Sequence, residues 1–251
     1  MRNEIIAAGS LAAVAFDLDG TLYPNYRLNR LLLPFGLKEW RFLWALGRAR
    51  ARIRAMQEFG KERMTPPEPG TAEPPQGRTE GFLPRSGTEF YDLQAALMAE
   101  MLGSGDASRI REKMEALVYR GWEPLFKKIR PFPHVAETLG ALKKAGLLLA
   151  LLSDFPPARK LENMGIGGFW DLVLCTEETG RLKPDPLPFA LLSRELKAPP
   201  GRILYVGNSV SYDVKGAKRA GMKTALIRRR PSPEADFCFH DYRQLLKYVI
   251  N

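Results

Sequence analysis

The chain has 251 residues, of which 45% are hydrophobic and 26% charged, a composition typical of a soluble globular protein. Its two cysteines, Cys175 and Cys238, lie far apart in sequence, which argues against a disulfide framework and favours a cytoplasmic location. No apolar run approaches the roughly 18 to 20 residues that a membrane-spanning helix requires. The formal net charge of +10 favours anionic partners without choosing among phosphorylated substrates, nucleic acid and acidic lipid.

The first predicted element is a buried strand that ends in two acids. An apolar run over 11–16 precedes Asp17, Asp19 and Gly20. Alternate residues of an extended segment share a face, so the two carboxylates can converge on one centre while Gly20 turns the backbone. Two such acids repel each other unless a divalent cation lies between them. Taken alone, the same residues also fit an ordinary turn after a strand.

The segment 24–130 is predicted to be a mainly helical insertion after this strand. Over residues 24–34 the chain is predicted to leave the core. Three later segments carry apolar residues at helical spacing: 37–64, 90–102 and 107–120. Asp106 is placed to cap the last of them. The intervening segment 65–87 is rich in Pro and Gly, which predicts an extended loop.

The first predicted helix of the insertion is strongly basic. Four arginines lie off its apolar stripe in two pairs, each four residues apart: Arg48 with Arg52, and Arg50 with Arg54. The leading interpretation is a solvated basic face on a packed helix. A lid that faces phosphate, or a surface helix on anionic lipid, are the alternatives, because aromatic and basic residues combine here. Membrane-surface contact is thus allowed but not favoured, and no nucleic-acid partner is expected.

From residue 131 onwards, apolar strands alternate with amphipathic helices. The predicted strands are 147–152, 172–175, 203–206 and 224–227, and the predicted helices are 134–145, 158–164, 187–196 and 212–220. This alternation predicts an α/β fold with a doubly wound, parallel, Rossmann-like sheet that binds ligands beyond the carboxyl ends of its strands. We therefore divide the chain into a core of 1–23 and 131–251 and the helical insertion. No function can be inferred for the tail, 228–251.

Four motifs resemble, in order and spacing, those of the haloacid dehalogenase-like hydrolases. They are Asp17-x-Asp19-Gly-Thr21, Ser153 after an apolar strand, Lys183-Pro-Asp-Pro, and Gly207-Asn-Ser-x-x-x-Asp213. The resemblance runs from residue 14 to about residue 222 and fails only over the middle insertion and the tail. It implies a phosphatase-type member of that family, with a helical cap domain over 24–130.

The resemblance also implies a role for each motif residue. Asp17 is the expected nucleophile that forms an aspartyl phosphate, and Asp19 the expected general acid and base. Thr21, Ser153 and Lys183 are expected to bind phosphate oxygens, and Lys183 also to stabilise the transition state. The expected cofactor is Mg²⁺, and its expected ligands are Asp17, Asp19, Asn208 and Asp213.

Each of these residues has an ordinary structural alternative. Ser153 and Thr21 can cap a helix or a turn, Lys183 can be a solvated loop cation, and Asp213 can be a helix first-turn acid. Asn208 departs from the family pattern, since related phosphatases usually carry Asp there. An amide oxygen can bind magnesium but brings no charge, so the expected affinity is lower unless Asp213 compensates. Asp213 is expected either to coordinate the metal or to orient Lys183.

The leading functional hypothesis is therefore a magnesium-dependent phosphomonoester hydrolase that acts on a small phosphorylated metabolite. A 2-haloacid dehalogenase is a second hypothesis, disfavoured because those enzymes do without the second acid that Asp19 supplies. A third is a catalytically weak or inactive family member whose basic cap binds anionic membrane or nucleic acid. The sequence leaves the substrate and the oligomeric state open.

Overall fold

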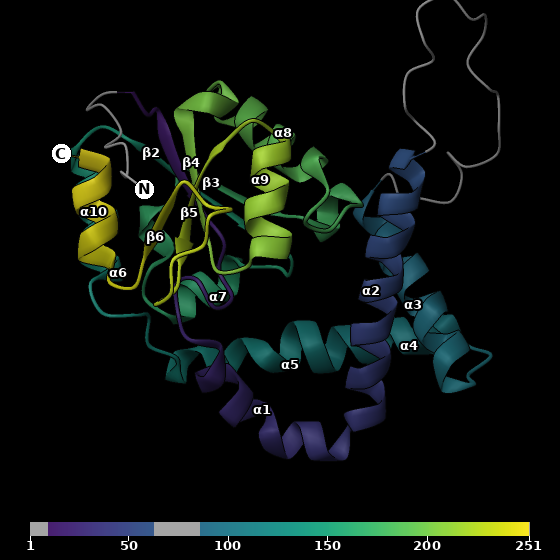
Figure 1. Cartoon of the computed structure of the whole chain (residues 1–251). Coiled ribbons are helices and arrows are strands. Elements are labelled where there is room, and N and C mark those ends of the chain that lie inside the picture. Colours follow the sequence, from purple (N-terminus) through teal and green to yellow (C-terminus); the bar gives the residue numbers. More distant parts are fainter. Residues whose placement is uncertain (1–9, 63–85, 251) are drawn as a thin grey trace, which may run out of the picture.

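The computed structural model describes residues 10–62 and 86–250, in which six parallel strands form one sheet in the order β3-β2-β1-β4-β5-β6 (Figure 1). The strands are β1 (Ala13–Phe16), β2 (Leu148–Ser153), β3 (Leu172–Cys175), β4 (Ile203–Gly207), β5 (Lys223–Ile227) and β6 (Phe237–Phe239). Strand β1 pairs with β2 on one side and β4 on the other, so the strand order reverses there. Ligands of such sheets bind at the carboxyl edge beside the reversal.

Alternate residues of the strands point into two different cores. In β1, Val14 and Phe16 pack in one cluster, whereas Ala13 and Ala15 pack in another on the opposite face. The first face is covered by α6 (Val135–Lys144), α7 (Ala158–Asn163) and α10 (Tyr242–Ile250), and the second by α8 (Pro186–Glu195) and α9 (Lys215–Arg219). Helices on both faces of a parallel sheet confirm the predicted doubly wound α/β fold.

The described residues between β1 and α6 form helices beside the sheet, and most of these helices share a separate hydrophobic cluster that Leu182 also joins (Figure 1). In chain order they are α1 (Asn25–Lys38), α2 (Trp40–Glu62), α3 (Gly87–Leu102), α4 (Ala107–Met114), the π-helical turn η1 (Glu115–Tyr119), α5 (Arg120–Trp122) and the 3₁₀ turn η2 (Glu123–Lys128). Asp106 caps α4 as predicted, by accepting the N–H of Arg109. The predicted loop 65–87 lies outside the described residues except for its last two, where Ser86 caps α3.

The prediction of an exit from the core over 24–34 is wrong, because most of that segment belongs to helix α1. Leu28 is buried, and Leu31 and Leu32 pack against the same core cluster. Phe35, one turn further on, makes an edge-on contact with the ring of Trp122. These apolar residues recur at helical spacing, but the Asn and Arg residues between them and Pro34 inside the helix obscured the stripe.

The prediction of a solvated basic face on α2 is wrong for half of its arginines. Two of the four are exposed: Arg48 and Arg52. Arg50 is buried in an ion pair with Glu177, and Arg54 is half-buried in an ion pair with Asp154. Arg50 and Arg54 lie one turn apart and face the α/β core, whereas the exposed pair faces away. The acidic partners lie 127 and 100 residues further along the chain, so the local spacing of the arginines could not reveal them.

The tail is part of the core, although no role could be inferred for it from sequence. It supplies β6 at one edge of the sheet and α10 on one face. The buried hydroxyl of Tyr242 in α10 donates a 2.6 Å hydrogen bond to the carbonyl of Thr21, in the loop that carries the two acids. The tail thus fixes the position of that loop. No helix within 10–62 and 86–250 is long and apolar enough to cross a membrane.

Candidate active site

The predicted site residues lie at the carboxyl edge of the sheet, around the strand where the order reverses. Asp17 directly follows β1, Ser153 is the last residue of β2, and Asn208 directly follows β4. The N–H of Asp17 donates to the carbonyl of Val206 at 2.9 Å, which extends the β1–β4 pairing to the acid itself. Because neighbouring parallel strands end at the same edge, residues from three distant motifs become neighbours.

Lys183, in the loop before α8, joins two of the acids. Its buried Nζ lies 2.6 Å from Oδ1 of Asp17 and 2.8 Å from Oδ1 of Asp213. It also donates to the carbonyl of Leu152 and to the hydroxyl of Tyr205, each at 3.3 Å. Burial lowers the pKa of Lys183, but the two carboxylates outweigh burial and raise that pKa well above its ordinary value. The ammonium therefore stays charged, and Lys183 is not a solvated loop cation.

Asp17 is almost completely buried, and both positive and negative side chains surround its carboxylate. Its Oδ2 accepts a 2.8 Å hydrogen bond from the hydroxyl of Thr21, and its Oδ1 faces Lys183. Burial raises the pKa of Asp17, Lys183 opposes this, and the neighbouring charges of Asp213 and Asp19 add to the increase, which brings the pKa to about 7. A single ammonium, that of Lys183, thus faces two buried carboxylates, Asp17 and Asp213.

Asp19 is held by two residues that sequence reasoning missed. The hydroxyl of Tyr23 donates to its Oδ1, and Nζ of Lys160 lies 3.3 Å from its Oδ2. The Lys160 ammonium lies 5.1 Å from the ring centre of Phe126 and 5.3 Å from that of Phe155. These rings shield it from water and strengthen its attraction to the carboxylate. The sequence gives no signal for Lys160, which comes from α7, 141 residues after Asp19.

Asp213 is oriented by the backbone at the end of β4. Its Oδ2 accepts the N–H groups of Asn208 at 3.1 Å and Ser209 at 3.0 Å, while its Oδ1 receives Lys183. A Cβ placed on Gly207 would lie 2.3 Å from the Cβ of Asp213, so only glycine allows this approach. Asp213 is therefore more than a first-turn helix acid, since its carboxylate links the β4 loop to Lys183.

The two predicted phosphate-binding hydroxyls have different surroundings. Thr21 is completely buried and donates to Asp17, the first acid of the site. Ser153 lies at the end of the adjacent strand, and its Oγ accepts the N–H of Phe155 at 3.2 Å. This contact closes a local turn and is not the cap of the next helix that was the alternative for Ser153, because α7 begins after Pro157 without a side-chain cap. The hydroxyl proton of Ser153 remains available for another acceptor. The hydroxyl of Thr21 is committed to Asp17.

One residue expected to hold magnesium, Asn208, lies against the turn at Gly20. A Cβ on Gly20 would lie 2.1 Å from the amide nitrogen of Asn208, so this side chain lies against the acid motif. Within residues 10–62 and 86–250 there is no group of three His, Cys, Asp or Glu residues suited to a metal. The carboxylate of Asp17, the carbonyl of Asp19 and the amide of Asn208 are nevertheless the kind of oxygen ligands that magnesium takes. These oxygens are of the type that suits the cation, and the carboxylates of Asp17 and Asp213 both bond Lys183 in this structure.

Asp154, which follows Ser153, anchors the insertion to the site, and the sequence analysis missed it. It receives the guanidinium of Arg54 at 2.7 Å, the hydroxyl of Thr176 at 2.7 Å and the backbone N–H of Lys183 at 3.2 Å. Burial raises the pKa of Asp154, but the charges of Lys183, Arg54 and Arg50 outweigh burial and lower the pKa to about 2. Arg54 also donates to the carbonyl of Lys183 at 2.8 Å. Helix α2 is thus bonded directly to the loop that carries the site lysine.

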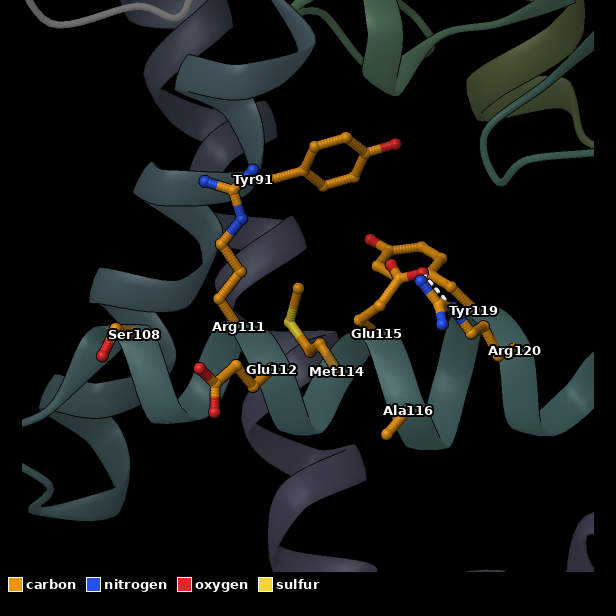
Figure 2. A pocket seen from close by; sticks show the side chains of 9 residues that line it. All are labelled: Tyr91, Ser108, Arg111, Glu112, Met114, Glu115, Ala116, Tyr119 and Arg120. Atoms are coloured by element: carbon orange, nitrogen blue, oxygen red, sulfur yellow. Dashed lines mark hydrogen bonds and ion pairs between the residues drawn. The ribbon is translucent and has the colours of Figure 1, made fainter.

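A cavity of about 830 Å³ lies within the insertion, and none of the predicted site residues lines it. Figure 2 shows the rings of Tyr91 and Tyr119 on one side of it and Arg111 and Met114 on another. The hydroxyl of Tyr119 donates to Glu177 of the core at 3.2 Å. This cavity belongs to the helical insertion and is separate from the cluster of acids.

Comparison with known proteins identifies the family. The family model for haloacid dehalogenase-like hydrolases matches residues 11–221. The chain belongs to this family. Members similar to it in sequence include a glyceraldehyde 3-phosphate phosphatase of Methanopyrus kandleri, 30% identical over 87% of this chain and 84% of the relative. A ribulose-1,5-bisphosphate 5-phosphatase of Halopiger xanaduensis is also 30% identical, over 89% of this chain and 87% of the relative.

Solved structures of the haloacid dehalogenase-like family share the fold. A HAD phosphatase from Thermococcus onnurineus superposes with a TM-score of 0.58 at 23% identity, covering 94% of this chain and 97% of that one. A 2-haloacid dehalogenase from Pseudomonas syringae gives a TM-score of 0.60 at 20% identity, covering 95% and 97%. At such identities the likeness concerns the fold alone, and it includes both phosphatases and dehalogenases.

Proposed function

We propose that this hydrolase is a magnesium-dependent phosphomonoesterase that acts on a small phosphorylated metabolite through an aspartyl phosphate. The observation that carries the proposal is the buried Lys183, whose ammonium is shared between Asp17 and Asp213 at the carboxyl edge of the sheet. A carboxylate beside a fixed positive charge supports phosphoryl transfer, which uses a nucleophile and a charge that stabilises the transition state. The names of the two sequence relatives, both phosphatases of small sugar phosphates, support the same class of reaction.

The chemistry follows from two carboxylates with different surroundings. An oxygen of Asp17 attacks phosphorus as the ester bond breaks, and Asp19 gives its proton to the departing oxygen. Asp19 then takes a proton from water, which attacks the aspartyl phosphate, releases inorganic phosphate and restores Asp17. Tyr23 and Lys160 hold the Asp19 carboxylate in place between these steps.

The remaining residues stabilise negative charge. Lys183 offers its ammonium to the equatorial oxygens of the transferring group, and Ser153 offers its hydroxyl proton to a phosphate oxygen. Asp213 acts through Lys183, because its carboxylate orients that ammonium. Asp17, the carbonyl of Asp19 and Asn208 would hold Mg²⁺, which supplies charge that offsets the repulsion between a phosphate dianion and the acids.

We also propose that 24–130 is a cap domain that covers the site. Tyr119 and Trp122 of the insertion contact the ring of Phe155, two residues after Ser153, at centre distances of 6.5 Å and 6.4 Å. Arg50 and Arg54 bind Asp154, which lies between Ser153 and Phe155 in the sequence. An apolar cover that is anchored beside the phosphate-binding residues would exclude water and select the leaving group.

The test is phosphate release by the purified chain from a panel of phosphomonoesters, with Mg²⁺ or with a chelator. The panel includes glyceraldehyde 3-phosphate, ribulose 1,5-bisphosphate and phosphoglycolate. The proposal expects release that is abolished both by chelator and by Asp17→Asn. A folded protein that releases no phosphate from any ester would overturn it, and halide release from a 2-haloacid in the presence of chelator would favour the dehalogenase instead.

A further inference from the structure

Helices α1 and α2 meet at an angle on the side of the insertion remote from the sheet (Figure 1). Around this junction four large apolar side chains are exposed to solvent: Leu33 (62%), Leu37 (73%), Trp40 (63%) and Trp44 (51%). We call them the elbow patch. The two leucines lie one turn apart on α1, and the two tryptophans lie one turn apart on α2, so each helix presents a pair on one face.

Within the described residues, the elbow patch is not the face through which either helix packs on the rest of the protein. Helix α1 packs on the core through Leu28 and the residues at positions 31 and 32, and α2 packs through Phe42, Leu46 and Ala49. The exposed pairs lie on the outward faces of the same helices. Grouped large apolar residues, unlike a single one, mark a surface that contacts another apolar phase.

The surroundings of the elbow patch are positively charged. Four basic side chains next to its members along the two helices are exposed: Arg30, Lys38, Arg41 and Arg48. Between residues 25 and 57 the sequence contains one acid, Glu39. Its carboxylate is paired with Lys113 of α4 at 2.8 Å, so its charge is compensated. The surface around the patch therefore attracts anions.

We propose that the elbow patch binds an anionic lipid surface. Tryptophan is enriched at the membrane interface, where its ring lies at the level of the headgroups, and leucine side chains reach the acyl boundary. Exposed Lys and Arg residues beside them attract acidic headgroups. A second copy of the chain is a poorer occupant, because a symmetric dimer would bring the same basic residues together. This inference is independent of the proposed phosphatase activity.

The experiment is cosedimentation of the full chain with vesicles of phosphatidylcholine alone or of phosphatidylcholine mixed with phosphatidylserine. Binding is expected only to the anionic vesicles, with a shift of tryptophan emission to shorter wavelength and release at high salt. Two variants test the two components: Leu37→Ser with Trp40→Ser, and Lys38→Glu with Arg41→Glu. Each basic charge removed should weaken binding by roughly fivefold or more.

The matched control is Arg229→Glu with Arg230→Glu, which reverses two exposed charges on the core and leaves the elbow unchanged. Circular dichroism is used to check that each variant is folded. Equal loss of vesicle binding in this control and in the elbow charge variant would overturn the proposal, because net charge alone would then explain binding. Absence of binding to anionic vesicles would also overturn it, and so would a dimer, detected by light scattering, that Trp40→Ser dissociates.

Discussion

Asp154→Asn is the substitution that best tests how the insertion is attached to the core. The carboxylate side chain is 15% exposed and lies 2.7 Å from the guanidinium of Arg54 and 3.8 Å from that of Arg50. Asparagine has nearly the same shape but no charge. It would therefore leave the positive charge of Arg54 without its acidic partner, and it would leave Arg50 with Glu177 alone.

The expected loss in the free energy of unfolding follows from the burial of this ion pair. Removing one partner of a buried ion pair costs about 3–5 kcal/mol, and we expect about 3 kcal/mol here because Arg50 keeps a second carboxylate. The matched control is Glu100→Gln, which removes the acid of another arginine on the same helix. Arg52 and Glu100 are 3.0 Å apart but 49% and 63% exposed. Such a pair contributes about 0–1 kcal/mol.

Urea unfolding, followed by circular dichroism and by tryptophan fluorescence, measures both variants. Asp154→Asn should lower the midpoint clearly more than Glu100→Gln does, and the two probes can separate if the insertion unfolds first. Equal, small losses in the two variants would refute the reasoning, since the buried pairs would then contribute no more than exposed ones.

The same carboxylate predicts a dependence of stability on pH. The pKa of Asp154 is lowered from 3.8 to about 2 in the folded chain, so the carboxylate stabilises the fold above pH 4. This contribution, about 2 kcal/mol from the pKa difference, is lost as the pH falls through about 2. Unfolding measured between neutral and acid pH should therefore show a shallower acid loss for Asp154→Asn than for the parent chain.

Three further substitutions test the site. Gly207→Ala should lower kcat about a hundredfold, because the new methyl group would lie 2.3 Å from the Cβ of Asp213 and displace the carboxylate that orients Lys183. Lys160→Met, which removes the ammonium beside the second acid, should lower kcat about tenfold with a smaller change in KM. Asn208→Asp adds a charged oxygen ligand, so half-maximal activity should need roughly tenfold less Mg²⁺.

Each of these predictions has its own control or contrary result. Gly201→Ala is the control for the first, because a Cβ there meets no atom within 4 Å and activity should persist. A Lys160→Met enzyme with full kcat would show that the contact with Asp19 does not serve the reaction. If Asn208→Asp needs as much magnesium as the parent, that side chain does not bind the metal.

The alternation of apolar strands with helices was sufficient to predict the doubly wound core, because each strand alternates its residues between two buried faces with a period of two. The motif residues could also be predicted, since Asp17 and Asn208 follow strands and Ser153 ends one, and the carboxyl ends of these strands meet at one edge. Helix α1 was missed because polar residues and an internal proline interrupt a stripe that becomes apparent only when it packs on the core.

The sequence by itself determined where the acids leave the sheet, because local hydrophobic periodicity and a glycine turn specify that without any distant partner. Only the tertiary structure decided which acidic side chain pairs with each buried basic side chain. Whether Arg50 is solvated or buried depends on Glu177, 127 residues further along, and Lys160 reaches Asp19 across 141 residues. Ion pairs between distant segments leave no periodic signal, since a charged side chain is equally compatible with solvent until folding places an opposite charge beside it.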